Sequence, residues 1–142
     1  MKVFPPPDLA ITSRLASPSE ESKGEKGINW GWSARDGFHA FRGATPKGAR
    51  DPLLETRHAD GNCAIVGGYV YRGRAIPALR GVYLYGDNCR PNIEGLVQRG
   101  GRAIAQHDVG LTVRALTTFG EDRTGELYAA ARGGTIFRIA AR

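Results

Sequence analysis

Few residues in this chain of 142 amino acids carry side chains that commonly do catalytic or metal chemistry. Its histidines are His39, His58 and His107, and its cysteines are Cys63 and Cys89. The two cysteines lack the CxxC spacing of a zinc site, and no histidine stands at ligand distance from them in the sequence. Two buried, inert thiols are one interpretation of these cysteines, a disulfide is the other, and we predict no metal site.

Acidic residues offer a second kind of chemistry. Asp87 and the pair Glu121 and Asp122 carry the oxygen atoms that calcium prefers, but their spacing is not that of a dedicated calcium loop. Residues 122–125, Asp-Arg-Thr-Gly, are typical of a turn between two strands, because Asp and Gly favour turn geometry. We therefore predict a turn at Asp122.

Glycine pairs begin at positions 67, 100 and 133. None is followed by Lys-Ser or Lys-Thr or opens a predicted helix, so we expect no loop that binds nucleotide phosphates. Gly67 and Gly68 should let two backbones approach closely, while the other two pairs should form hairpin turns.

The composition predicts one all-β domain. Short apolar groups alternate with Gly, Pro and Asp, and 20 residues are glycine. The net charge of +6 is spread along the chain without a basic stripe, so we expect no nucleic-acid partner. No apolar stretch approaches the ~20 residues of a membrane span, and residues 1–7 lack the apolar core of a signal peptide.

The predicted elements fall into three regions. Residues 1–26 lack apolar periodicity and are expected to be a flexible arm. Residues 29–32, Asn-Trp-Gly-Trp, should form a short strand that leads into a long irregular loop through Phe38, Phe41 and Pro52. Beyond the loop, a set of four strands and then a set of three are expected, at residues 64–72, 82–86, 93–98 and 103–108, and at 115–119, 126–130 and 135–140.

Several motifs recur in an order known from one family. They are Asn-Trp-Gly-Trp at 29–32, Gly-Gly-Tyr-Val-Tyr-Arg-Gly at 67–73, the segment from Ile76 to Asp87, Thr-Phe-Gly-Glu-Asp at 118–122 and Gly-Glu-Leu-Tyr at 125–128. Residues 27–142 thereby resemble the soluble sugar dehydrogenases that use pyrroloquinoline quinone, the glucose/sorbosone dehydrogenase family. The resemblance implies about two blades from the C-terminal part of a six-bladed β-propeller, the last blade lacking its fourth strand.

The resemblance also implies what the site should contain. In the family a histidine accepts the sugar hydroxyl proton while a hydride passes to the quinone, and calcium helps to hold the cofactor. No histidine of this chain matches the catalytic motif, so we predict no catalytic residue here. His39 is expected in an exposed loop and His107 on an outer strand.

Two residues are candidates for cofactor binding by the same resemblance. Arg90 stands where the glucose-oxidising branch has a cofactor-facing arginine, and a guanidinium there would pair with a quinone carboxylate through two hydrogen bonds. Around it, Pro91 replaces a usual Gly, Asn92 a frequent Arg and Glu94 a frequent aromatic. A strand should begin only after Pro91, with Glu94 pointing outward. His58, in a segment that resembles the family's Ser-His-acidic-Gly motif, should fix a loop and is the weaker candidate.

The resembling branch has cysteines at both ends of this strand pair, which implies a disulfide between Cys63 and Cys89 and a periplasmic or secreted protein. The sequence supports two functions. One is a C-terminal fragment of a quinone-dependent sugar dehydrogenase, inactive alone, whose complete form binds a sugar substrate, the quinone and calcium. The other is a non-catalytic binding or structural module. In either case, exposed blade edges should promote self-association or leave the isolated chain marginally stable.

Overall fold

The computed structural model of this chain describes residues 29–100 and 102–141. The predicted arm, residues 1–26, lies outside this part, so its boundary with the domain stays a prediction. The described residues form strands and short 3-10 helices, with no α-helix among them. In order, the elements are β1 (Arg35–Asp36), β2 (His39–Ala40), η2 (His58–Asp60), β3 (Ile65–Val66), η3 (Pro77–Leu79), β4 (Tyr83–Asp87), β5 (Asn92–Arg99), β6 (Arg102–Thr112), β7 (Leu116–Glu121), β8 (Leu127–Ala131) and β9 (Ile136–Arg138).

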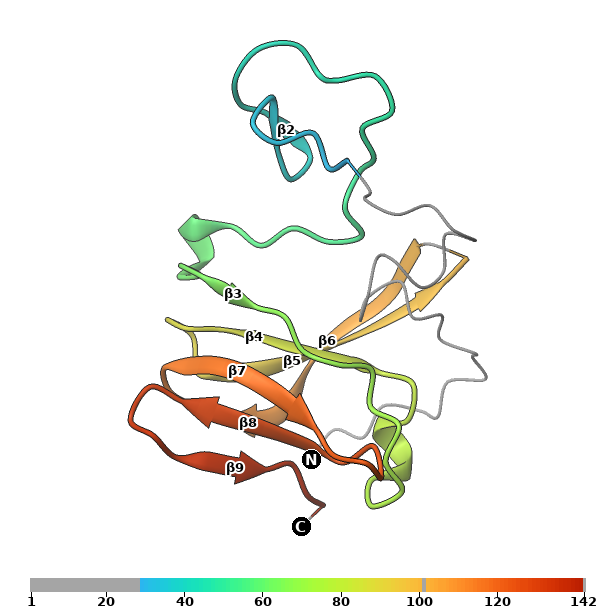
Figure 1. Cartoon of the computed structure of the whole chain (residues 1–142), viewed down its shortest axis with the longest axis vertical. Helices are drawn as coiled ribbons and strands as arrows, with labels where there is room; N and C mark the ends of the chain where they lie inside the picture. The colour runs from blue at the N-terminus through green and yellow to red at the C-terminus, as the bar shows by residue number, and fades with distance from the viewer. Residues whose placement is uncertain (1–28, 101, 142) are drawn as a thin grey trace.

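The two predicted sets of strands are confirmed as two antiparallel sheets. The first has the order β3-β4-β5-β6 and the second has the order β7-β8-β9 (Figure 1). β5 begins at Asn92, directly after Pro91, as expected for a residue that cannot donate a backbone hydrogen bond. No helix in the described ranges is long and apolar enough to span a membrane.

The strand expected at residues 64–72 is shorter than predicted, because β3 ends before the glycine pair. The backbone continues beside β4 and pairs again through a bridge from Val70 to Tyr83. A Cβ atom at Gly68 would overlap the carbonyl oxygen of Leu84 and would lie 2.9 Å from Cδ2 of Phe119. The predicted close approach of backbones at this pair is therefore confirmed.

The strand predicted at residues 29–32 is wrong. Gly31 has a φ of +84°. Its N–H donates a hydrogen bond to Oδ1 of Asn29 at 2.8 Å, and its carbonyl oxygen accepts the Arg35 N–H at 2.8 Å. These local hydrogen bonds make a turn, and the first strand is instead β1, which pairs with β2 in a small hairpin. The hairpin belongs to a lobe at one end of the molecule, away from the two sheets (Figure 1).

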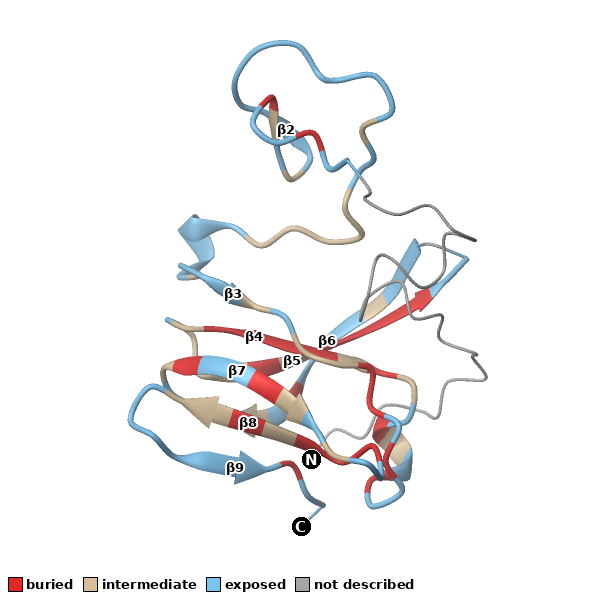
Figure 2. Cartoon of the chain, viewed as in Figure 1, coloured by how far each residue is buried: buried red, intermediate tan, exposed pale blue. Residues whose placement is uncertain are grey.

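The hydrophobic core lies between the two sheets. Buried residues concentrate on β4, β5, β7 and β8 (Figure 2). Large side chains with almost no exposure come from both sheets and their connections: Tyr71, Val82, Leu84, Ile93, Leu116 and Leu127. Burying each aliphatic side chain contributes roughly 1.5–3 kcal/mol, so this shared core holds the two sheets together.

Candidate functional site

The loop between β4 and β5 carries Arg90 and is held by Asp87. The buried carboxylate of Asp87 accepts backbone N–H groups from Cys63 at 3.1 Å, Ala64 at 2.9 Å, Cys89 at 2.8 Å and Arg90 at 3.4 Å. Burial alone would raise the pKa of Asp87, but these N–H groups outweigh it and lower the pKa below its usual value. Asp87 therefore stays ionised and fixes the backbone beneath Arg90.

The same loop is cross-linked. Cys63 and Cys89 form the expected disulfide, with their Cα atoms 5.7 Å apart. Their sulfur atoms and the carboxylate of Asp87 lie close enough together to suggest metal ligands. The sulfurs are bonded to each other, however, and the carboxylate already accepts four N–H groups, so this cluster is a structural clamp.

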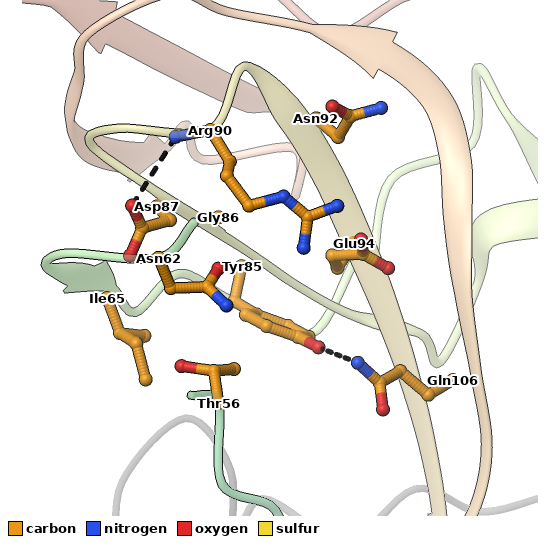
Figure 3. Close-up of a pocket in the computed structure, with 10 residues that line it drawn as sticks. All are labelled: Thr56, Asn62, Ile65, Tyr85, Gly86, Asp87, Arg90, Asn92, Glu94 and Gln106. Atoms are coloured by element: carbon orange, nitrogen blue, oxygen red, sulfur yellow. Dashed lines mark hydrogen bonds between the residues drawn. The ribbon is translucent and has the colours of Figure 1, made fainter. Parts of the chain in front are cut away.

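The side chain of Arg90 extends over a small polar pocket. Figure 3 shows its guanidinium near Glu94 and the ring of Tyr85, whose hydroxyl accepts a 2.7 Å hydrogen bond from Gln106. The pocket measures about 30 Å³. Among the described residues, no carboxylate lies within ion-pair distance of the Arg90 guanidinium. Its N–H groups therefore remain available to a ligand.

The groups around Arg90 have shifted pKa values. Burial raises the pKa of Tyr85 to about 12, with a further contribution from the negative charge of Glu94. Burial and the neighbouring Asp108 likewise raise the pKa of Glu94, while the positive charge of Arg90 opposes the shift. Glu94 lies on the face of β5 away from the core residue Ile93, as expected, but its side chain is half-buried because it lines the Arg90 pocket.

The pocket is too small to enclose a three-ring quinone, since it holds little more than one water molecule. The residues present would instead supply one wall of such a site, with Arg90 as the group that meets a carboxylate. Glu94 beside it would weaken that contact by repelling the same carboxylate.

His58 has the structural contact that was expected. Its Nδ1 lies 3.0 Å from the carbonyl oxygen of Asn62, and the Asn62 amide donates in turn to the Arg57 carbonyl at 3.0 Å. These bonds fix the loop around η2. Whether His58 touches a cofactor stays a prediction.

A much larger hollow adjoins the Arg90 pocket and was not foreseen. It measures about 610 Å³ and lies between the β1–β2 hairpin, the segment from Glu55 to His58, and β3. Glu55 accepts the Phe38 N–H at 2.9 Å and lies 3.0 Å from Nε2 of His39. No sequence pattern indicates this pair, because its members are 16 residues apart and come from segments without a shared motif.

The remaining candidates have structural positions. His39, expected in a loop, lies on β2 and is exposed, and His107 lies on the outer strand β6 as expected. The turn predicted at Asp122 is confirmed, since its Oδ1 accepts the Thr124 N–H at 2.8 Å and the Glu126 N–H at 3.1 Å.

No protein-family model matches this chain. Solved structures similar to it include two that are described as glucose dehydrogenase. The first has a TM-score of 0.57 at 20% identity, and the match covers 82% of this chain and 36% of the glucose dehydrogenase chain. The second has a TM-score of 0.55 at 20% identity, and the match covers 82% of this chain and 35% of the glucose dehydrogenase chain. The chain thus spans about a third of the length of the glucose dehydrogenases that it matches.

The two antiparallel sheets are blades of a partial β-propeller, one with four strands and one with three. More particularly, they have the fold of part of a glucose dehydrogenase. The resemblance seen in the sequence is confirmed at this level.

Proposed function

We propose that this chain forms one part of the cofactor face of a propeller dehydrogenase that oxidises sugars with pyrroloquinoline quinone. The observation that carries the proposal is the Arg90 guanidinium, which has no ion-pair partner among the described residues and stands on a loop fixed by Asp87 and the disulfide. Such a group suits a quinone carboxylate, because a rigid guanidinium forms two parallel hydrogen bonds with it.

The roles of the residues follow from this geometry. Arg90 binds and orients a carboxylate, while Asp87 and the disulfide keep the loop from moving. When bound, the quinone would supply the hydride-accepting chemistry. We expect no dehydrogenase activity from this chain alone, since it provides only one wall of the site.

Calcium enters the proposal only through the family resemblance. The carboxylates of Asp87 and Asp122 already accept backbone N–H groups, and they have little capacity left for a cation. The sugar substrate is likewise proposed for a longer, complete protein. The disulfide supports a periplasmic or secreted location, since such bonds persist in oxidising compartments.

The test is a titration of the purified chain with pyrroloquinoline quinone, with and without calcium, followed by absorbance and thermal melting. A ligand that binds only the folded state raises the melting temperature. We expect saturable binding that Arg90→Ala weakens about tenfold or more, a loss of about 1.4 kcal/mol. Arg80→Ala, at an exposed arginine of η3's C-terminal end, is the matched control and should bind like the parent chain.

Glu94→Gln gives a second test of the same site. Removing the negative charge beside Arg90 should strengthen quinone binding, whereas an unaffected affinity would place the quinone elsewhere. The alternative function, a non-catalytic binding or structural module, is favoured by the small size of the Arg90 pocket. Absence of binding at high micromolar quinone would support that alternative and overturn the proposal for this chain.

A further inference from the structure

The 610 Å³ hollow beside the β1–β2 hairpin has the size of a small-molecule site. Its lining mixes apolar surface with polar side chains, and the hydrogen bonds of its two histidines decide which ring nitrogens carry protons. Nδ1 of His58 faces a carbonyl oxygen, which can only accept, so Nδ1 is the donor and Nε2 is an acceptor. Each histidine can be assigned in this way from its partner.

The protonated ring nitrogen of His39 can be assigned from its partner in the same way. Its Nε2 lies 3.0 Å from Glu55 Oε1. The Phe38 N–H lowers the pKa of Glu55, with the His39 and Arg57 side chains also contributing, so this carboxylate is ionised at neutral pH and accepts the Nε2 proton. Nδ1 of His39 is then an acceptor, and no described residue donates to it.

Two further acceptors line the hollow. Asp36 forms no ion pair or side-chain hydrogen bond with a described residue. The amide nitrogen of Asn62 is used by the Arg57 carbonyl, which leaves its Oδ1 without a donor. The single lining cation, Arg57, already interacts with Glu55, at 3.4 Å.

The unpaired side-chain groups identified above are therefore acceptors, and the charged side chains that line the hollow are mostly negative. Asp36, Glu55 and Asp87 line it against Arg57 alone, although the whole chain carries a net charge of +6. Anionic and neutral acceptor-rich ligands would meet unpaired lone pairs here. A ligand with an ammonium group would satisfy both the charge and the acceptors.

We propose that this hollow is a binding site for a small hydroxylated amine, whose ammonium group is held by Asp36 and whose hydroxyls donate to Nδ1 of His39, Nε2 of His58 and Oδ1 of Asn62. The site differs from the proposed quinone site at the Arg90 pocket in the charge of its ligand, because it selects a cation and not a carboxylate. It needs neither the quinone nor dehydrogenase activity.

The probes are glucamine and glucitol, which share a hydroxylated carbon chain and differ by an ammonium group in place of one hydroxyl. Both are titrated into the full chain at neutral pH by calorimetry and by NMR of the backbone amides. We expect glucamine to bind at least tenfold more tightly than glucitol, with shifts at residues 36–39 and 55–64. Equal affinities, or tighter glucitol binding, would overturn the proposal.

Variants test the assigned groups one at a time. Asp36→Asn should weaken glucamine about tenfold and leave glucitol unchanged, since it removes the charge and keeps the side-chain shape. Asp60→Asn, at an exposed aspartate of the neighbouring η2, is the matched control. An unchanged glucamine affinity in Asp36→Asn would contradict the assignment.

His39→Gln keeps an N–H donor to Glu55 but removes the Nδ1 acceptor, so it should weaken both probes without unfolding the loop. Its melting temperature checks the fold. Arg90→Ala separates this site from the proposed function, because that variant should lose the quinone and still bind glucamine. Loss of glucamine binding in Arg90→Ala would show that the two sites are one and would overturn the assignment.

Discussion

The hydroxyl of Tyr71 donates a hydrogen bond of 2.6 Å to Oε2 of Glu126, a residue 55 positions away in the sequence. The other oxygen of Glu126 accepts the N–H groups of Arg74 at 2.9 Å and Ala75 at 3.0 Å, and the Tyr71 hydroxyl accepts the Ile76 N–H at 3.0 Å. The hydrogen bond from Tyr71 lowers the pKa of Glu126, and burial raises the pKa of Tyr71 to about 12. This network joins the connection after β3 to the start of β8.

Tyr71→Phe should destabilise the fold by about 1–3 kcal/mol, because it removes the bond to a carboxylate and leaves the Ile76 N–H without its acceptor. Urea unfolding followed by circular dichroism measures the change. Tyr69→Phe is the matched control, at a half-buried tyrosine for which no hydroxyl hydrogen bond is seen. Equal effects of the two variants would show that the network contributes little.

Acid should destabilise the turn before β8. The Thr124 hydroxyl, the largest cause, and the Thr124 and Glu126 N–H groups lower the pKa of Asp122 to about 2. An unfolded aspartate titrates near ~3.9, so the ionised form stabilises the fold above that pH, and this contribution is lost as the pH falls toward 2. Asp122→Asn should flatten the stability profile between these values, as measured by urea unfolding at each pH. Asp60→Asn should leave the profile unchanged, and a parent-like profile in Asp122→Asn would contradict the prediction.

Reduction of the disulfide should destabilise the folded chain and free the Arg90 loop. The cross-link closes a loop with a sequence separation of 26, which the loop-entropy relation converts to about 3–4 kcal/mol. The measurement is unfolding with and without a reductant. A Cys63→Ser, Cys89→Ser double variant should match the reduced parent and show no further response to the reductant. A parent that is equally stable when reduced would contradict this expectation.

Gly68→Ala should be strongly destabilising, because the added Cβ would overlap the Leu84 carbonyl oxygen and lie 2.9 Å from Cδ2 of Phe119. Overpacking of this kind costs about 1–3 kcal/mol or more, since backbone must shift. Gly120→Ala is the control, as nothing lies within 4 Å of a Cβ added there. Thermal melting of the two variants should separate them clearly, and similar melting temperatures would show that the sheets can move apart.

Self-association should occur along β9, one of the two edge strands of the three-stranded sheet. Its side chains at Ile136 and Phe137 are 71% and 43% exposed, and a hydrophobic edge of this kind invites pairing with another chain. Ile136→Lys should weaken association about tenfold in analytical ultracentrifugation, because a lysine at an edge disfavours strand pairing. Ile104→Lys, on the edge strand β6, should have no effect. The reverse result would place the association on the other sheet.

The sequence by itself determined the number and order of the strands after residue 60. Apolar runs such as Tyr83–Tyr85 and turn residues such as Asp122 act locally, so the sets of four and three strands could be predicted from them. The motif order also pointed to the fold now seen in the similar structures and to the disulfide. Local signals failed at Asn29–Trp32, where side-chain and glycine hydrogen bonds made a turn in place of a strand.

Tertiary structure alone decided which side chains meet. Tyr71 and Glu126 are brought together by the packing of sheets and loops, as are His39 and Glu55, and no motif predicts either pair. The same packing places Arg90 and Glu94 in one pocket. The alternation along β5 places Glu94 away from the core, but its partial burial in a pocket shared with Arg90 could not be predicted from that pattern (Figure 3). The sequence determines the charge and hydrogen-bonding capacity of each side chain. The partner of each side chain depends on contacts between distant segments, which form only when the core between the two sheets closes.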